Sequence, residues 1–201
     1  MDERPSTTDS YDKVMRAIHW TTLLLITGVF VTIWSADPRL VGRANALLIV
    51  QIHRSLGLTV CALTIFRLAW RWHARIPPLP GDLPTIQRWA ARANEGLIYV
   101  LLLAQPVVGL LYSNSYGIQV NLFLMVQLPT VIAHDPAFGE TLGALHNFLG
   151  YSLLALIGAH AAAALFHHFI RRDDVLNAML PVRLRDIGRE AFALGRPRRQ
   201  T

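Results

Sequence analysis

Four long apolar stretches, each close to the length that crosses a lipid bilayer, most constrain what this chain can fold into. A helix of about 20 residues spans the hydrocarbon core, which is about 30 Å thick. We expect membrane-spanning helices over residues 14–35, 46–72, 94–112 and 142–170. The first stretch follows a long polar leader, so we interpret it as a retained span and not as a cleaved signal peptide. The sequence therefore predicts an all-α membrane protein built as a four-helix bundle.

The segments between these stretches contain residues that end helices. Asp37-Pro38 ends the first stretch, and the proline-rich segment 76–84 cannot form a regular helix. Residues 117–133 are apolar enough to suggest a fifth span, but four residues interrupt them: Gln119, Asn121, Gln127 and Pro129. We interpret this segment as a loop or short interfacial element over the mouth of the bundle. Pro106 lies inside the third stretch, where it favours a kink.

Composition narrows the functional classes. The chain has 201 residues, of which 53% are hydrophobic and 16% charged, and a net charge of +6. Its basic residues cluster beside apolar stretches and do not alternate with aromatic residues, so membrane topology explains them better than nucleic-acid binding. Cys61 is the only cysteine. It excludes a disulfide framework or a four-thiolate metal site within this chain, and we expect it to be a core residue.

The distribution of positive charge predicts the orientation. Lysine and arginine precede the first stretch, lie between the second and third, and follow the fourth. The segment 113–141 has none, and the segment 37–45 has only Arg39 and Arg43. Because positive residues accumulate on the cytoplasmic side, we expect both termini in the cytoplasm. We divide the chain into a cytoplasmic N-terminal segment (1–13), a four-helix domain (14–181) and a basic cytoplasmic tail (182–201).

Four histidines lie inside the apolar stretches: His19, His53, His146 and His160. An imidazole in the hydrocarbon core is costly and usually marks a function. In the expected topology, His19 and His160 lie near the cytoplasmic side, and His53 and His146 lie near the outer side. Matching depth therefore predicts two facing pairs, His19 with His160 and His53 with His146.

The spacing of these residues suggests haem. His146 and His160 share roughly one helix face, separated by about 21 Å of rise. Zinc would need three or four ligands at one point, whereas a haem needs two axial ligands from the protein. We therefore predict two b-type haems inside the bundle, each between two histidines. Such ligation leaves no open iron position, which favours electron transfer over oxygen binding. The alternative is a non-redox scaffold with structural histidines.

Other residues could belong to these sites. Arg54, Arg67 and Arg71 are candidate partners of haem propionates, although arginines that extend toward the membrane surface are an alternative interpretation. His167 shares the face of His160 and could replace it as the partner of His19, but we favour His160. We interpret His167 and His168 as interfacial residues or quinone contacts. We expect His73 and His134 to be solvated.

Seven segments carry a resemblance to a known family: AIHW (17–20), IHRSLG (52–57), RLAWR (67–71), PVVG (106–109), LHNFLGY (145–151), AHAAAALFHH (159–168) and RDDVLNAMLP (172–181). In these segments the chain resembles the bacterial cytochrome b561 family, whose members are four-helix, di-haem membrane proteins. The resemblance implies a location in the bacterial inner membrane and haem ligation by the same two histidine pairs. There is one departure, because many members carry a histidine on the third helix shortly before the tyrosine that corresponds to Tyr99, and here that position is Glu95.

The resemblance also implies quinone-linked electron transfer. One branch is similar to superoxide:ubiquinone oxidoreductase, so the first hypothesis is an enzyme that oxidises superoxide or another small donor at the periplasmic side and reduces ubiquinone in the membrane. The second is a haem-carrying electron-transfer subunit that anchors a dehydrogenase or accepts electrons from a periplasmic cytochrome. The expected partners are the bilayer, quinone, and superoxide or a redox protein.

Overall fold

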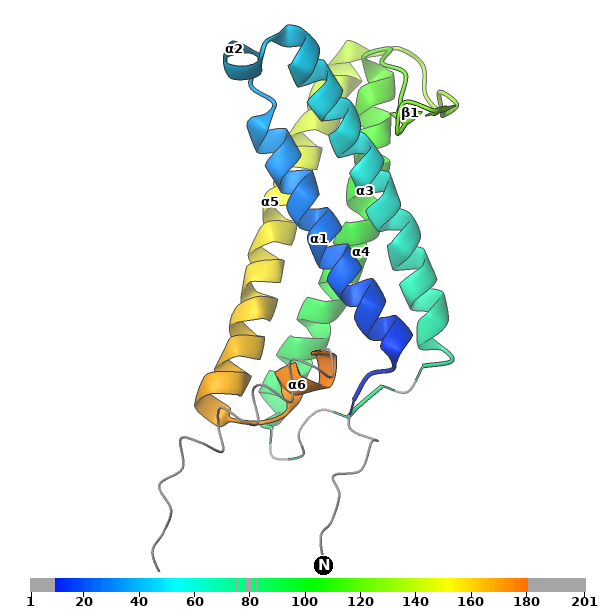
Figure 1. Ribbon diagram of the computed structural model, residues 1–201. Helices are drawn as coiled ribbons and strands as arrows, with labels where there is room; N and C mark the ends of the chain where they lie inside the picture. Colours follow the sequence, from blue (N-terminus) through cyan, green and yellow to red (C-terminus); the bar gives the residue numbers. More distant parts are fainter. Residues whose placement is uncertain (1–9, 75, 79–80, 82, 181–201) are drawn as a thin grey trace, which may run out of the picture.

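The computed structural model describes residues 10–74, 76–78, 81 and 83–180. Four long helices run in alternating directions (Figure 1): α1 (Lys13–Ser35), α3 (Arg43–Arg71), α4 (Thr85–Ser115) and α5 (Pro136–Phe166). Within the described residues, the helices long and apolar enough to cross a membrane are these four, the last extended to Arg171 by a π-helical turn. The expected helical membrane bundle is confirmed.

Short elements connect and extend the long helices: α2 (Pro38–Val41), β1 (Asn121–Leu122), β2 (Val126–Gln127), the π-helical turn η1 (His167–Arg171) and α6 (Val175–Met179). β1 and β2 form an antiparallel hairpin in which Asn121 pairs with Gln127 and Leu122 with Val126. The segment 117–133 is thus a hairpin loop, as expected, and not a fifth span. α4 continues through Pro106 and ends at Ser115.

Aspartates mark the starts of two long helices. The Asp12 side chain accepts a hydrogen bond from the Met15 N–H at 2.8 Å, and Asp135 accepts one from Phe138 at 3.0 Å. These bonds satisfy backbone donors that a helix N-terminus leaves free. α4 and α5 begin earlier than predicted, at Thr85 and Pro136, because hydropathy locates only the part of a helix that crosses hydrocarbon.

The helices pack as two close pairs, α1 with α3 and α4 with α5, and α3 also contacts α4. Glycines on α5 permit the close approach to α4. A Cβ added at Gly139 would lie 2.6 Å from Ser115 Oγ, and one at Gly143 would lie 2.9 Å from the Tyr112 ring. Small residues at such spacings let side chains of a neighbouring membrane helix lie close to the backbone. Cys61 is half-buried and not a core residue.

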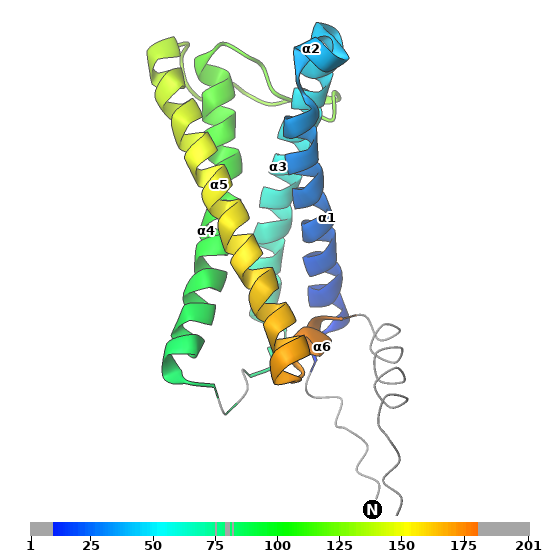
Figure 2. The same ribbon diagram turned by 90° about the vertical axis from the view of Figure 1, so that its left-hand side faces the viewer.

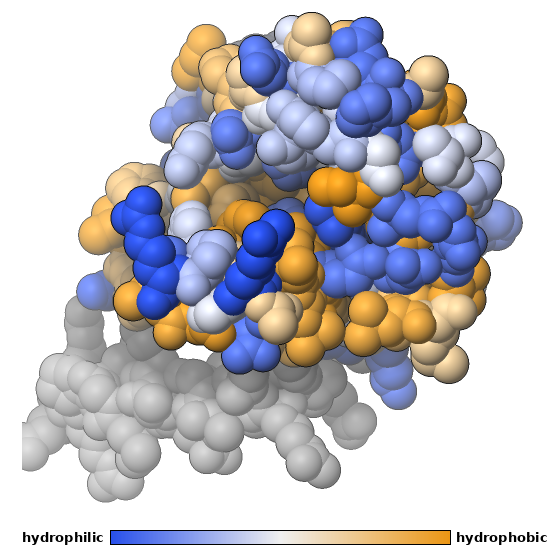
Figure 3. Space-filling model, turned by 90° about the horizontal axis from the view of Figure 1, so that it is seen from above, coloured by the Kyte–Doolittle hydropathy of each residue, from blue (hydrophilic) through white to orange (hydrophobic). Residues whose placement is uncertain are grey.

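The two ends of the bundle differ. We call the end with α2 and the β1–β2 hairpin the hairpin end, and the opposite end, with Tyr11 and α6, the termini end (Figures 1 and 2). Viewed onto the hairpin end, hydrophilic residues cover much of the end face, and hydrophobic residues are seen around its edge (Figure 3). The predicted tail 182–201 and the first nine residues of the predicted N-terminal segment lie outside the described residues.

Candidate functional site

The four intramembrane histidines form two facing pairs. The ring centres of His19 and His160 lie 6.3 Å apart, and those of His53 and His146 also lie 6.3 Å apart. In each pair, α5 supplies one ring and the α1–α3 helix pair supplies the other. The histidine pairs therefore connect the two close helix pairs across the interior of the bundle.

Helix register explains why the depths match. His53 and His146 are each the eleventh residue of their helices, which both start at the hairpin end. His19 is the seventh residue of α1, and His160 is the seventh from the end of α5, both counted from the termini end. Between the two sites lies an apolar core centred on Val60, Leu102 and Leu153.

Neighbouring groups fix the rings at the hairpin end. His53 Nδ1 lies 2.9 Å from the Val29 carbonyl oxygen. Since a carbonyl can only accept, His53 donates its Nδ1 proton and keeps a free electron pair on Nε2, as a metal ligand requires. His146 packs against Gly109, where an added Cβ would lie 2.9 Å from its Cε1 atom. The Gln105 amide donates to the backbone carbonyl of His146 at 2.8 Å.

A cavity of about 330 Å³ adjoins the His53–His146 pair and lies between the two close helix pairs. Its lining includes Arg54, Gly57, Gln105 and Tyr112. Arg54 also donates to the Gln51 side chain at 2.9 Å. Gln105 Oε1 and His146 Nδ1 are buried and have no hydrogen-bond partner among the described residues. A mostly apolar cavity with a few polar groups is typical of a cofactor site.

At the termini end, Arg67 joins the histidine pair to Tyr99. Arg67 Nη1 lies 3.3 Å from His19 Nδ1, and the guanidinium carbon lies 5.5 Å from the centre of the Tyr99 ring. Arg67 Nε and the Tyr99 hydroxyl are both buried without a hydrogen-bond partner in the described part of the chain. Two such donors beside the histidines fit an anionic group, such as a haem propionate.

Arg71, the third predicted propionate partner, also lies at the termini end, but its side chain has a different partner. It forms an ion pair with Glu95, with Nη1 and Oε1 2.5 Å apart. Binding a propionate would require Arg71 to leave this carboxylate. Nearby, burial raises the pKa of the Tyr11 hydroxyl, and the Glu95 carboxylate adds to this, while Arg71 and Arg67 oppose it. Glu95 thus belongs to a charged cluster next to the termini-end site.

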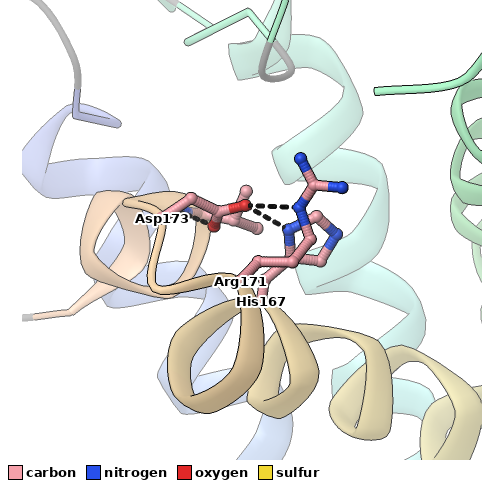
Figure 4. A network of polar contacts seen from close by, with 4 residues as sticks. His167, Arg171 and Asp173 are labelled. Carbon is pink, nitrogen blue, oxygen red and sulfur yellow. Dashed lines mark hydrogen bonds and ion pairs between the residues drawn. The ribbon is translucent and has the colours of Figure 1, made fainter. Parts of the chain in front are cut away.

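The alternative interpretation made His167 the partner of His19. In the structure, His167 does not face His19. Its Nδ1 bonds to the carboxylate of Asp173, which also accepts from Arg171 Nε at 3.3 Å (Figure 4). Burial opposes ionisation of Asp173, but the bonds from His167, Val175 and Arg171 outweigh it, so the pKa of Asp173 lies below its usual value. His73 and His134 are exposed, as expected.

The ring separations fit one metal atom between each pair. With metal–nitrogen bonds of about 2.0 Å and ring nitrogens about 1.2 Å from the ring centre, opposed imidazoles on one atom have centres about 6.4 Å apart. The observed value is 6.3 Å at both sites. Groups of three or more His, Cys, Asp or Glu that could hold a metal are absent from the described residues. The donor set therefore suits a cofactor with its own equatorial ligands, as haem has.

Several residues of the sites were not found from the sequence. Val29 contributes a backbone carbonyl, for which the sequence carries no signal. Gly109 appeared only within the PVVG segment (106–109), and Tyr99 only as a reference position. Gln105 carried a signal, because a polar amide in the middle of an apolar stretch needs a partner inside the protein. Ligation by the four histidines and the roles of the three arginines remain predictions.

The features of the fold and the site together define a class, the helical membrane proteins with opposed histidine pairs inside the bundle. Residues 10–182 match the family described as prokaryotic cytochrome b561, and the chain belongs to this family. It is therefore a bacterial membrane protein of a family that carries electrons with b-type haem.

Curated relatives agree with this assignment. Cytochrome b561 homolog 2 of Escherichia coli (strain K12) is 31% identical over 91% of this chain and 97% of its own length. Cytochrome b561 homolog 1 of the same organism is 27% identical over 86% and 98%. The probable superoxide oxidase CybB of Yersinia pestis is 28% identical over 85% and 96%.

Proposed function

We propose that this protein transfers electrons across the bacterial inner membrane through two b-type haems, oxidising superoxide at the periplasmic side and reducing ubiquinone in the membrane. The observation that carries the proposal is the pair of histidine sites, with the same ring separation of 6.3 Å, stacked along one bundle. The Yersinia pestis relative, named as a probable superoxide oxidase, supports superoxide as the donor.

Each of the two proposed haem sites has its own set of residues. His53 and His146 would hold one haem, and His19 and His160 the other. When bound, each haem would supply an iron atom that changes between the ferric and ferrous states. Val29 keeps the Nε2 electron pair of His53 available, and Gly109 leaves room for the His146 ring. Arg54 and Arg67 would hold propionates, since each lies beside a histidine pair.

The overall reaction balances without a further reactant. Two superoxide ions give two molecules of oxygen and two electrons, and ubiquinone takes up two electrons and two protons to become ubiquinol. Arg39, Arg43 and Arg54 lie toward the hairpin end, which the charge distribution assigns to the periplasm, and would attract the superoxide anion. The apolar core around Leu153 separates the two sites with hydrophobic side chains.

The test uses purified protein in proteoliposomes that contain ubiquinone. Superoxide generated outside should produce ubiquinol, and added superoxide dismutase should abolish the product. Protein that shows the haem spectrum but forms no ubiquinol without another protein would contradict the proposal and support an electron-transfer subunit for a dehydrogenase or periplasmic cytochrome. Colourless protein, made with ample iron and porphyrin, would contradict haem binding altogether.

A further inference from the structure

We propose that the tip of the β1–β2 hairpin, residues 123–126, inserts into the bilayer leaflet at the hairpin end and anchors the hairpin there. The four tip side chains are apolar and well exposed: Phe123 at 51%, Leu124 at 62%, Met125 at 86% and Val126 at 56%. The hairpin projects sideways from the bundle (Figure 1). The argument below uses its depth, its chemistry and its backbone.

The hairpin is attached to the side of α3 and not to its end. The Phe123 N–H donates to Ser55 Oγ at 2.9 Å, and the Gln51 amide lies 3.4 Å from the Asn121 carbonyl oxygen. Gln51 and Ser55 lie about 12 and 18 Å along α3 from its first residue, Arg43. These contacts therefore fix the depth of the hairpin relative to the bundle.

This depth lies at the level of the hydrocarbon. α3 has 29 residues and is about 43 Å long, whereas the hydrocarbon core is about 30 Å thick, so about 7 Å of a centred α3 extends past each boundary. The attachment at Gln51 and Ser55 is deeper than that. A tip that projects sideways from this depth meets acyl chains or the headgroup boundary.

The chemistry of the segment fits lipid better than a protein partner. Between Glu95 and Asp135 the chain contains no Asp, Glu, Lys or Arg. A docking surface for a soluble redox protein usually carries charges that steer the encounter, and this hairpin has none to offer. The spans also expose apolar side chains of this kind, such as Leu24 at 72% exposure.

The hairpin backbone suits this location because several of its N–H groups have partners within the protein. The Phe123 N–H bonds to Ser55, the Met125 N–H donates to the Leu122 carbonyl oxygen at 3.0 Å, and the strands pair with each other. Backbone in hydrocarbon must be satisfied within the protein. Phe123 and Leu124 have positive φ values, 49° and 63°. This conformation is unfavourable for large side chains, and burial of those side chains in lipid would offset its cost.

The root of the hairpin lies beside the His53–His146 site. Val120, at its root, is 2% exposed and lines the cavity beside His53 and His146. An anchored tip would therefore hold this part of the cavity wall in place from the membrane side.

The experiment places an environment-sensitive fluorophore on single cysteines. In a Cys61→Ser background, the variants Leu124→Cys and Met125→Cys are labelled with a nitrobenzoxadiazole dye and reconstituted in lipid nanodiscs. Arg39→Cys, on the exposed helix α2 of the same end, is the aqueous control, and Leu24→Cys is the lipid control. Emission should shift to shorter wavelength at 124 and 125, and spin-labelled lipids should quench it there as strongly as at 24.

The opposite result overturns the proposal. Emission at both 124 and 125 that matches position 39, with quenching by aqueous iodide and none by spin-labelled lipid, would place the tip in water. Such a tip would be free for a protein partner. Labelling two tip positions guards against one variant that fails to fold, and elution of each protein as a single species on gel filtration verifies folding.

Discussion

At the scale of single residues, three of the four proposed ligands have a close neighbour at the ring. His53 is oriented by the Val29 carbonyl, and His146 by the space above Gly109. His19 faces Arg67, which can only donate, so in this contact His19 Nδ1 accepts. A ring that binds metal through Nε2 carries its proton on Nδ1. Metal binding at His19 would therefore release Arg67 toward another acceptor, such as a propionate.

The pairing of the histidines predicts which substitutions act on the same haem. His53→Ala and His146→Ala should each reduce the haem content from two to one per chain, and so should His19→Ala and His160→Ala, because one axial ligand is lost in each case. Haem content is measured from the pyridine haemochrome spectrum. His134→Ala, which removes an exposed ring, is the control and should retain both haems.

Double variants distinguish this pairing from any other. His53→Ala combined with His146→Ala should still bind one haem, because both changes act on one site. His53→Ala combined with His160→Ala should bind none. If the first combination lost both haems while each single variant lost one, the assignment of partners would be wrong.

Gly109 predicts a steric effect at a single site. In Gly109→Ala the new Cβ would lie 2.9 Å from His146 Cε1, so the ring or the helix must shift. Overpacking of this kind costs about 1–3 kcal/mol. We expect loss of haem at the hairpin end and a lower Tm, measured by haem content and thermal unfolding in detergent.

Gly158→Ala is the matched control on α5. Nothing lies within 4 Å of its added Cβ, and alanine favours a helix over glycine by about 1 kcal/mol. This variant should keep both haems and an equal or higher Tm. Equal haem loss in both variants would mean that contact with His146 is not the cause of the loss in Gly109→Ala.

At the scale of elements, α5 ends irregularly. It passes into the π-helical turn η1, and Arg172 follows in the left-handed region with φ of 58°. Single π-helical turns often occur at functional positions. α6 then folds back toward α1, where the Trp20 indole and Arg16 donate to the carbonyl oxygens of Met179 and Leu180, both at 3.0 Å. This return closes the termini end beneath His19.

Asp173 holds this turn, so Asp173→Asn should loosen α6. The change weakens the bonds from His167 and Arg171, and a hydrogen bond to a charged group contributes about 1.5–3 kcal/mol. We expect faster amide hydrogen exchange across residues 173–180, measured by mass spectrometry. Asp174→Asn is the control, because its contact with Asn177 is exposed to solvent. Similar exchange in both variants would contradict this role.

The same carboxylate predicts a pH dependence. Because the pKa of Asp173 is lower in the folded protein than its usual value, its ionised form stabilises the fold fully above about pH 4. This contribution is lost as the pH falls through the folded-state pKa. Exchange across α6, corrected for the intrinsic rate, should therefore increase on acidification in the wild type, and the increase should be smaller in Asp173→Asn.

Element boundaries show where sequence reasoning reaches its limit. Hydropathy located four spans because bilayer thickness fixes the length of the apolar stretch. It placed the start of the third helix at residue 94 and not at Thr85, since residues 85–93 are helical without being apolar. The hairpin at 121–127 was predicted only as a loop or interfacial element. Its turn places Phe123 and Leu124 at positive φ, where residue preferences favour glycine or asparagine.

At the scale of the whole molecule, alternation of the spans determines which histidines can meet. Four spans with both termini on one side bring residues from odd and even helices to the same depth, so the sequence alone placed His19 level with His160 and His53 level with His146. Whether the paired rings face each other depends on how each helix is rotated about its own axis, and hydropathy does not give that rotation. The ion pair of Arg71 with Glu95 was also not foreseen, because each side chain was considered only on its own helix.

The charge distribution makes a final prediction about the direction of the molecule in the membrane. In the sequence, lysine and arginine gather before the first span, within residues 71–92 and after residue 170, whereas the segments 37–45 and 113–141 at the hairpin end carry only Arg39 and Arg43. Because positive residues stay in the cytoplasm, a green fluorescent protein fused to either terminus should fluoresce. Alkaline phosphatase, which is active outside, should be active when inserted after Gly117 and inactive at the termini. The reverse pattern would place superoxide oxidation at the termini-end site, next to Arg67 and the Arg71–Glu95 pair, and would reassign the electron donor side.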